Sequence, residues 1–82
     1  MFQETFEKMG FAQAAPDVWM REFTHPETGE ILRIDLSPRR DGAIHARYTR
    51  GGRFVRDKKY WKSPKVAANS IRRSVTDAGF EV

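Results

Sequence analysis

Cysteine is absent from the 82 residues, and no long apolar run interrupts the polar ones. Without cysteine there is no disulfide framework and no thiolate metal site, so the apolar core alone must stabilise the fold. Charged residues make up 32% of the chain, and the mean hydropathy of -0.69 argues against a membrane span. The first residues also lack the basic and then apolar pattern of a secretion signal. We therefore expect a soluble, cytoplasmic, globular protein.

Repeats, low-complexity tracts and long linkers are also missing, which predicts a single small domain over residues 1–82. Hydrophobic residues (39%) and aromatic residues (12%) are sufficient for one core. A chain of this length leaves little room for a deep catalytic cleft.

Acidic residues are scarce in the second half of the chain. Residues 1–35 carry seven acids and three bases, a net charge of -4, whereas residues 36–82 carry four acids and twelve bases, a net charge of +8. A surface of one sign attracts a polyanion. This asymmetry favours a nucleic-acid partner, although it also serves solubility.

Two segments have the apolar spacing of helices. Phe2, Phe6 and Met9 fall on one helical face, and Gly10 followed by Phe11 is typical of a helix C-terminus. Near the other end, Ser63 and Pro64 form a good N-terminal cap, and an apolar stripe follows at Ala67, Ile71, Val75 and Ala78, before a second Gly-Phe pair at Gly79 and Phe80. Residues 12–17, which include Pro16, are interpreted as a connection.

Two hairpins are predicted between these helices. Residues 17–23 and 30–37 flank a turn that contains Pro26 and Gly29, and Leu32, Ile34 and Leu36 alternate with polar neighbours. A second hairpin turns at Gly51-Gly52. The order therefore predicts an α+β domain with one antiparallel sheet of three to four strands and both helices on one of its faces (α-β-β-β-β-α).

The Gly51-Gly52 turn also predicts a register. Arg50 would oppose Arg53, and Thr49 would oppose Phe54. Continuing without interruption, Tyr48 would oppose Val55, Arg47 would oppose Arg56, and His45 would oppose Lys58. One face would then carry the core residues Ile44, Ala46, Tyr48 and Val55. The other face would carry Arg47 opposite Arg56, and a bound polyanion would relieve the repulsion between these like charges.

This layout resembles the double-stranded-RNA-binding and HicA-like fold. The similarity to HicA-type toxins rests on "MGF" after the first helix, "FTHPETG" at the first hairpin and "IRRSVTDAGFEV" at the end, and "KKYWKSPKVAANSI" is similar to the start of the last helix in double-stranded-RNA-binding domains. HicA-type toxins cleave RNA with a histidine at the first strand, where this chain has "APDVW". The resemblance therefore implies RNA binding but not the nuclease activity. The arm domain of phage integrases is a second architectural comparison.

No catalytic or metal centre is predicted. His25 and His45 are far apart in sequence and lack neighbours at metal-ligand spacing, and Glu27 and Glu30 would lie in water at a hairpin tip. Trp19, Tyr60 and Trp61 are interpreted mainly as core residues. Phe54 stands among basic residues, where it could stack on a base or cover a helix.

The sequence thus predicts a non-enzymatic nucleic-acid-binding module without a cofactor, for duplex DNA or structured RNA. The predicted binding residues lie on a basic sheet and hairpin surface and on the outer face of the last helix: Arg47, Arg50, Arg53, Phe54, Arg56, Lys58, Lys59, Lys62, Lys65, Asn69, Arg72 and Arg73. The alternative is a small accessory or inhibitor protein of a phage or mobile element that binds an acidic protein partner.

Overall fold

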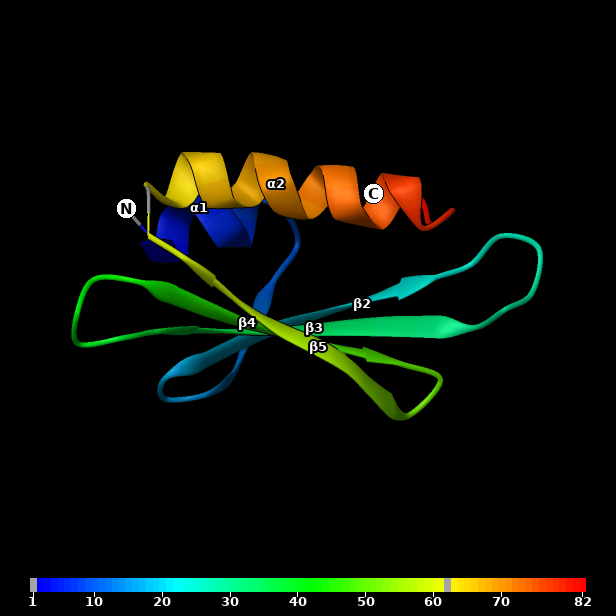
Figure 1. Ribbon diagram of the computed structural model, residues 1–82, viewed down its shortest axis with the longest axis horizontal. Coiled ribbons are helices and arrows are strands. Elements are labelled where there is room, and N and C mark those ends of the chain that lie inside the picture. The colour runs from blue at the N-terminus through cyan, green and yellow to red at the C-terminus, as the bar shows by residue number, and fades with distance from the viewer. Residues whose placement is uncertain (1, 62) are drawn as a thin grey trace.

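The computed structural model describes residues 2–61 and 63–82. Within this part of the chain, five strands form one antiparallel sheet in the order β1-β2-β3-β4-β5, and two helices lie on one side of it (Figure 1). The prediction of an α+β domain with an N-terminal and a C-terminal helix is confirmed. The elements are α1 (Phe2–Lys8), β1 (Ala12–Ala15), β2 (Val18–Thr24), β3 (Ile31–Pro38), β4 (Ile44–Arg50), β5 (Arg53–Tyr60) and α2 (Pro64–Asp77).

The segment predicted as a connection is in fact the strand β1, so the predicted number of three to four strands is too low. Ala12 pairs with Met20 and Gln13 pairs with Trp19 across the β1–β2 ladder, and Pro16 lies in the turn between the strands. All four residues of β1 are exposed. Alanine and glutamine show no alternation of apolar and polar residues, so the pairing with β2 produces this strand without a sequence signal.

The two Gly-Phe pairs end the helices as predicted. The Phe11 N–H donates to the Phe6 carbonyl at 3.0 Å, and the Phe80 N–H donates to the Val75 carbonyl at 3.1 Å. Both phenylalanine rings are buried. At the start of α2, the Ser63 hydroxyl accepts the Val66 N–H at 3.4 Å, which confirms the predicted cap.

The core lies between the helices and the covered face of the sheet. Leu32, Ile34 and Leu36 of β3 are buried there, as predicted, beneath Ile71 and Val75 of α2. Ala78, which was predicted in the apolar stripe of α2, is exposed, and Ala68 is buried in the same helix. Neither helix in the described residues is long and apolar enough to cross a membrane.

The hairpin of β4 and β5 begins with the predicted register. Gly51 and Gly52 have φ values of 58° and 79°, which permit a two-residue turn that L-residues with a Cβ rarely adopt. Arg50 opposes Arg53 and Thr49 opposes Phe54, as predicted. One residue further along, however, the register shifts, and Tyr48 opposes Arg56 instead of Val55.

Val55 is the extra residue of this β-bulge, and every later pair is displaced by one position. Arg47 opposes Asp57, and His45 opposes Lys59, so the predicted pairs of Arg47 with Arg56 and His45 with Lys58 are wrong. Val55 is 50% exposed, although it was predicted in the core. A one-residue shift reverses the face of each side chain, so the remainder of β5 turns its residues to the opposite faces from those predicted.

The bulge has a physical reason in the core. It places Tyr60 on the covered face opposite Ile44, where the Tyr60 ring is buried and its hydroxyl lies 3.0 Å from that of Tyr48. Burial, together with the hydrogen bond to Tyr60, raises the pKa of Tyr48. An uninterrupted register would turn Tyr60 to solvent and Lys59 toward the helices, and burying an unpaired ammonium group is costly.

Deleting Val55 should therefore preserve the fold, because it removes the residue that has no partner across the hairpin. Deleting Lys58 instead should disrupt folding, because it reverses the faces of Lys59 and Tyr60 and turns the Tyr60 ring away from the core. Thermal unfolding followed by circular dichroism compares the two. Equal losses of stability in both deletions would contradict the bulge.

Ile71→Ala should lower the free energy of unfolding by about 2 to 5 kcal/mol, because the fully buried side chain leaves a cavity between α2 and the sheet. Arg72→Ala, at the neighbouring exposed position, is the control and should have little effect. Urea denaturation measures both. Similar losses in the two variants would show that the buried face of α2 is wrongly assigned.

Candidate nucleic-acid interface

The bulge separates the predicted basic surface into parts that face different directions. Arg47 and Lys59 lie on the sheet face that carries no helix, together with Phe54, whereas Arg56 and Lys58 lie on the helix side of β5. Arg53 is exposed beside the turn. The sequence predicted that these residues form one surface of the sheet, and this prediction is wrong. They surround an edge strand instead.

Arg47 is engaged in an ion pair. Its Nε donates to Asp57 Oδ1 at 3.0 Å, and its Nη2 donates to Asp57 Oδ2 at 3.4 Å. The hydrogen bond from Arg47 holds the pKa of Asp57 below its ordinary value. His45 Nε2 lies 3.5 Å from the same carboxylate. The Arg47–Asp57 pair carries no net charge, and the residue opposite Arg47 on β5 is an acid and not the like-charged Arg56 that the sequence predicted.

Arg50 is also paired. Its Nε donates to Glu30 Oε1 at 2.6 Å, and its guanidinium lies 5.0 Å from the centre of the Phe80 ring. Glu30 is thus a partner in an ion pair, and not simply the water-exposed carboxylate that was predicted. Because Arg50 opposes Leu32 of the covered face, it joins the two hairpins near the end of α2. We assign Arg50 a structural role.

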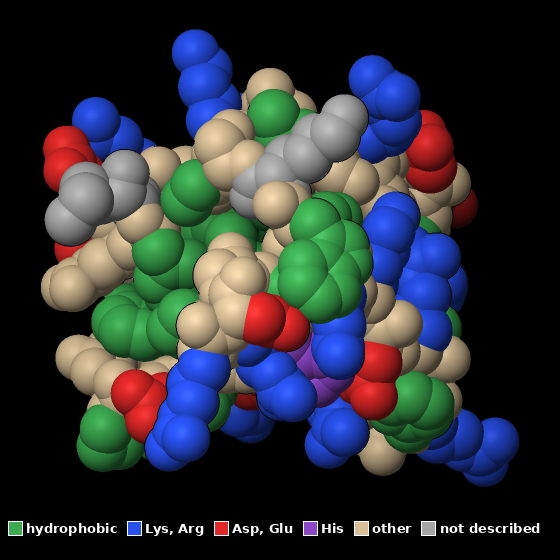
Figure 2. Space-filling model, turned by 60° about the vertical axis from the view of Figure 1, so that its left-hand side comes forward, with side chains coloured by type: hydrophobic (Ala, Val, Ile, Leu, Met, Phe, Trp, Pro, Cys, Tyr) green, Lys and Arg blue, Asp and Glu red, His purple; other side chains and the backbone are tan. Residues whose placement is uncertain are grey.

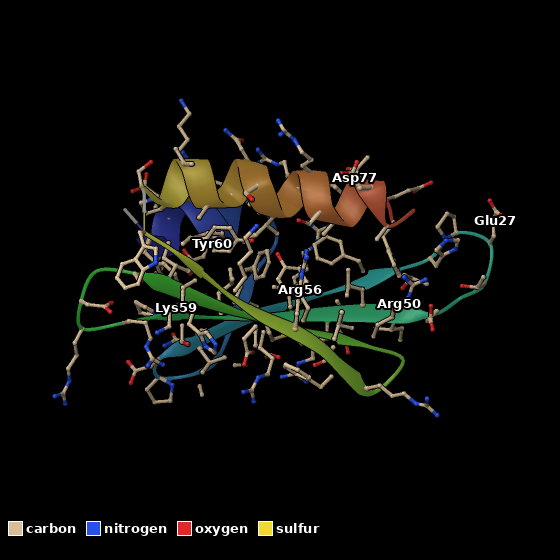
Figure 3. All side chains as sticks on the ribbon, in the orientation of Figure 1. Glu27, Arg50, Arg56, Lys59, Tyr60 and Asp77 are labelled. Atoms are coloured by element: carbon tan, nitrogen blue, oxygen red, sulfur yellow. The ribbon has the colours of Figure 1, made fainter. Side chains whose placement is uncertain are left out.

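Arg56 and Lys58 connect β5 with the helix layer. Arg56 lies 4.9 Å from the Tyr48 ring centre and donates to the Ser74 hydroxyl at 3.4 Å, and Figure 3 shows its side chain pointing from β5 toward α2. Lys58 Nζ lies 5.3 Å from the Tyr60 ring centre. The aromatic rings stabilise both cations, and neither cation pairs with a carboxylate in residues 2–61 and 63–82.

The predicted residues of α2 lie on its exposed surface. Lys65, Asn69, Arg72 and Arg73 are all exposed, and Arg72 donates to Asn69 Oδ1 at 3.3 Å. Lys62, which was also predicted, lies outside the described residues. We use the name basic edge for the cations of β5 and α2 that pair with no carboxylate among the described residues: Arg53, Arg56, Lys58, Lys59, Lys65, Arg72 and Arg73.

The space-filling view shows how these charges are distributed. In Figure 2, Lys and Arg side chains extend from the helix layer and from the sheet, and Asp and Glu side chains stand between several of them. The basic residues thus line the periphery of the β5 and α2 side and do not merge into one uniform patch.

Two large aromatic rings are exposed near the basic edge. Phe54 is 63% exposed and Trp61 is 65% exposed. Arg47 lies 5.7 Å from the Phe54 ring centre, and Lys59 Nζ lies 5.9 Å from the Trp61 ring centre. Trp19 and Tyr60 are core residues as predicted, but the interpretation of Trp61 as core is wrong. Since neighbours in an extended segment point to opposite faces, burial of Tyr60 turns Trp61 outward.

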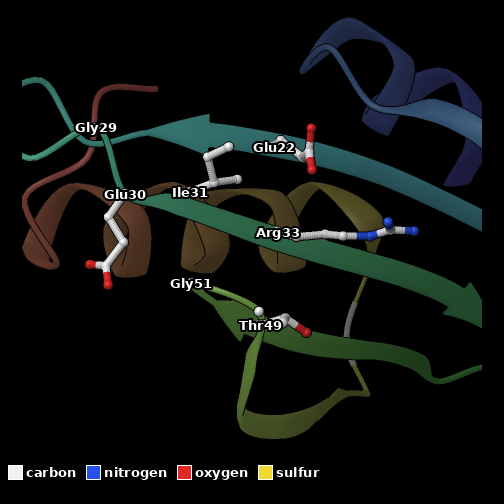
Figure 4. A pocket seen from close by; sticks show the side chains of 8 residues that line it. Glu22, Gly29, Glu30, Ile31, Arg33, Thr49 and Gly51 are labelled. Carbon is white, nitrogen blue, oxygen red and sulfur yellow. The ribbon is translucent and has the colours of Figure 1, made fainter.

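Polar and charged side chains line a hollow at the ends of the two hairpins. The hollow has a volume of about 540 Å³ and is lined by Glu22, Arg33, Thr49 and the Gly51-Gly52 turn (Figure 4). Arg33 pairs with Asp35 at 3.0 Å. Within residues 2–61 and 63–82, no group of three or more metal-ligating side chains is close enough to hold an ion.

His25 has a structural role at the first hairpin tip. Its Nδ1 accepts the N–H groups of Glu27 and Thr28, and its ring packs edge-on against Phe80 at a centroid distance of 5.2 Å. The histidine thus holds the turn against the C-terminal segment. It is far along the chain from His45, and the two do not form a shared site.

No family model, curated protein or solved structure matches the chain. The resemblance to the double-stranded-RNA-binding and HicA-like fold therefore stays a hypothesis.

The ion pair on the uncovered face gives a direct test of the hairpin register. Arg47→Ala should raise the pKa of Asp57 toward that of an exposed aspartate, about 3.9. In the wild-type protein the stabilisation by this pair is present above that value and is lost as the pH falls through the lower folded-state pKa. Carboxyl-carbon NMR titration measures the shift.

Arg33→Ala serves as the control, since Arg33 pairs with Asp35 and not with Asp57. It should leave the titration of Asp57 unchanged. An Asp57 pKa that does not differ between the wild-type protein and Arg47→Ala would contradict the observed pairing.

Proposed function

We propose that the protein is a non-enzymatic nucleic-acid-binding module that contacts phosphate groups through the basic edge. The single observation that carries this proposal is the set of cations on β5 and α2 that pair with no carboxylate among the described residues. Cations that have no carboxylate partner remain available to neutralise the phosphates of a polyanion.

The structure changes which residues the proposal uses. Arg47 and Arg50 are paired with Asp57 and Glu30, so we assign them supporting roles. Arg53, Lys58 and Lys59 are the strand residues best able to reach a phosphate, because they are exposed, have no acidic partner among the described residues and, unlike Arg56, make no side-chain hydrogen bond to the described residues of α2. Lys65, Arg72 and Arg73 extend the contact along α2.

Contacts of this kind position a nucleic acid without reading its sequence. Asn69 on α2 is the residue suited to a base edge, although its Oδ1 already accepts from Arg72, which leaves its amide group as the available donor. Phosphate contacts alone do not distinguish duplex DNA from structured RNA, so both are proposed ligands.

An acidic protein partner is the second candidate, and the exposed edge of β5 favours it. Seven of the eight residues of this strand are exposed, and an edge strand can accept a further strand from another chain. The positive side chains would select an acidic segment. This candidate becomes the stronger one if the nucleic-acid experiment below fails.

Binding should weaken strongly with salt. If the basic edge neutralises about four phosphates, the affinity for a short DNA duplex or an RNA hairpin should fall by about two orders of magnitude between roughly 50 and 200 mM salt. Replacing Lys58 and Lys59 with Gln should reduce the slope of log affinity against log salt by about two units. Fluorescence anisotropy of a labelled nucleic acid measures both.

Lys8→Gln is the control, because Lys8 belongs to α1 and lies 3.9 Å from Glu4, its ion-pair partner. It should change the slope very little. Absence of binding even at low salt would overturn the proposal. If Lys8→Gln reduced the salt slope as much as the double replacement does, binding would depend on the overall charge and not on the basic edge.

A further inference from the structure

Phe54 and Trp61 lie near opposite ends of β5, and neither ring is used by phosphate binding. An exposed tryptophan and an exposed phenylalanine cost free energy in a domain that buries most of its large aromatic side chains. Tyr60 and Trp19 illustrate the contrast, since both are buried. The exposure of these two rings beside cations requires its own explanation.

We infer that the ligand is an unpaired segment of nucleic acid that lies along β5, with bases stacked on Phe54 and Trp61. This inference rests on the proposed function and names the kind of nucleic acid that the site accepts. Aromatic side chains and positive charge are the two components of single-strand binding surfaces. In a duplex the faces of the bases are already stacked on one another, so they are not free to stack on these rings.

The two rings stand at opposite ends of the same edge strand, with Phe54 on its uncovered face and Trp61 directly past its last residue. Phe54 opposes Thr49, which belongs to the uncovered face. Trp61 follows Tyr60, whose ring is on the covered side, and it lies near Lys59 of the uncovered side. At about 3.3 Å per residue the rings are on the order of 20 Å apart along the strand, which suits a segment of several nucleotides.

The groups between the rings are suited to a nucleic-acid backbone. Asp57 is the acid of β5, and Arg47 neutralises it, so it repels phosphate less than a free carboxylate. Lys59 stands beside Trp61, while Lys58 reaches the same exposed edge from the helix side. Figure 2 shows hydrophobic groups separated by Lys, Arg, His and acidic side chains on one face.

The surroundings of Trp61 also favour a planar ligand. A shallow hollow of about 240 Å³ lies between the end of β5 and the start of α2, and Tyr60, Trp61 and Val66 supply apolar parts of its wall, with Lys58 and Lys59 beside them. Val66 is itself 47% exposed. A base stacked on Trp61 would cover apolar surface that is otherwise in contact with water.

A second copy of the chain suits this surface poorly. Antiparallel pairing of two β5 strands would bring the cations of one copy against those of the other, and like charges directly opposed destabilise a sheet. A polyanion with aromatic bases satisfies both the charges and the rings. Self-association is therefore an outcome of the test and not the proposal.

Tryptophan fluorescence of the full chain tests the inference. The probes are oligothymidine, oligouridine and a blunt duplex, so that DNA, RNA and strand pairing are compared. The single strands should bind more tightly than the duplex and quench the emission of exposed Trp61, while buried Trp19 is shielded. Trp61→Phe should abolish most of the quenching and retain much of the affinity, because a ring remains.

Trp61→Ala and Phe54→Ala should each lower the single-strand affinity by about five- to 150-fold with an unchanged salt slope, as expected for the loss of one stacked base. Ile31→Ala, which shortens another exposed apolar side chain, is the matched control and should leave the affinity unchanged. Circular dichroism and sedimentation at the working concentration report the fold and the oligomeric state.

The outcomes separate the two proposals. If all probes bind equally, without quenching, and Trp61→Ala and Phe54→Ala bind as the wild type does, stacking is overturned while phosphate binding stands. If no probe binds at low salt, both are overturned. A dimer that dissociates in Trp61→Ala or Phe54→Ala would overturn the inference by assigning the rings to self-association.

Discussion

The burial of Tyr60 determines how the basic half of the molecule is arranged. For Tyr60 to reach the core beside Tyr48, β5 must include the unpaired residue Val55, and that bulge sets the direction of each side chain between the turn and the end of the strand. Arg47 then lies opposite Asp57, and Arg56 lies over the Tyr48 ring. A packing requirement in the core thereby decides which cations are paired and which are free to meet a ligand.

The same constraint explains why the surface differs from a uniformly basic sheet. The uncovered face carries the ion pairs of Arg33 with Asp35 and of Arg47 with Asp57. The cations of the basic edge lie on β5 and α2, and Lys59 is the one of these that belongs to the uncovered face of the sheet. An edge strand with positively charged side chains also resists pairing with other copies of itself, which protects a long exposed edge from aggregation. The same positive charges therefore suit both solubility and the proposed binding of a polyanion.

The sequence predicted those features that depend on local chemistry. The Gly-Phe helix ends, the Ser63 cap, the alternation of Leu32, Ile34 and Leu36, and the turn at Gly51-Gly52 each have a local pattern, and the structure contains them. Strand β1 has no such pattern, because its residues are small or polar and exposed. The bulge at Val55 depends on contacts of Tyr60 with residues of β4, which periodicity within β5 does not reveal.

The central claim is that β5 and the exposed side of α2 bind nucleic acid. Amide NMR spectra recorded during titration with a short oligonucleotide test it most directly, because they report each element separately. The account predicts shifts that grow with the nucleic acid and are confined to β5, its turn and α2, with β1 and α1 unaffected. Shifts centred on β1 and α1, or no shifts at low salt, would contradict it.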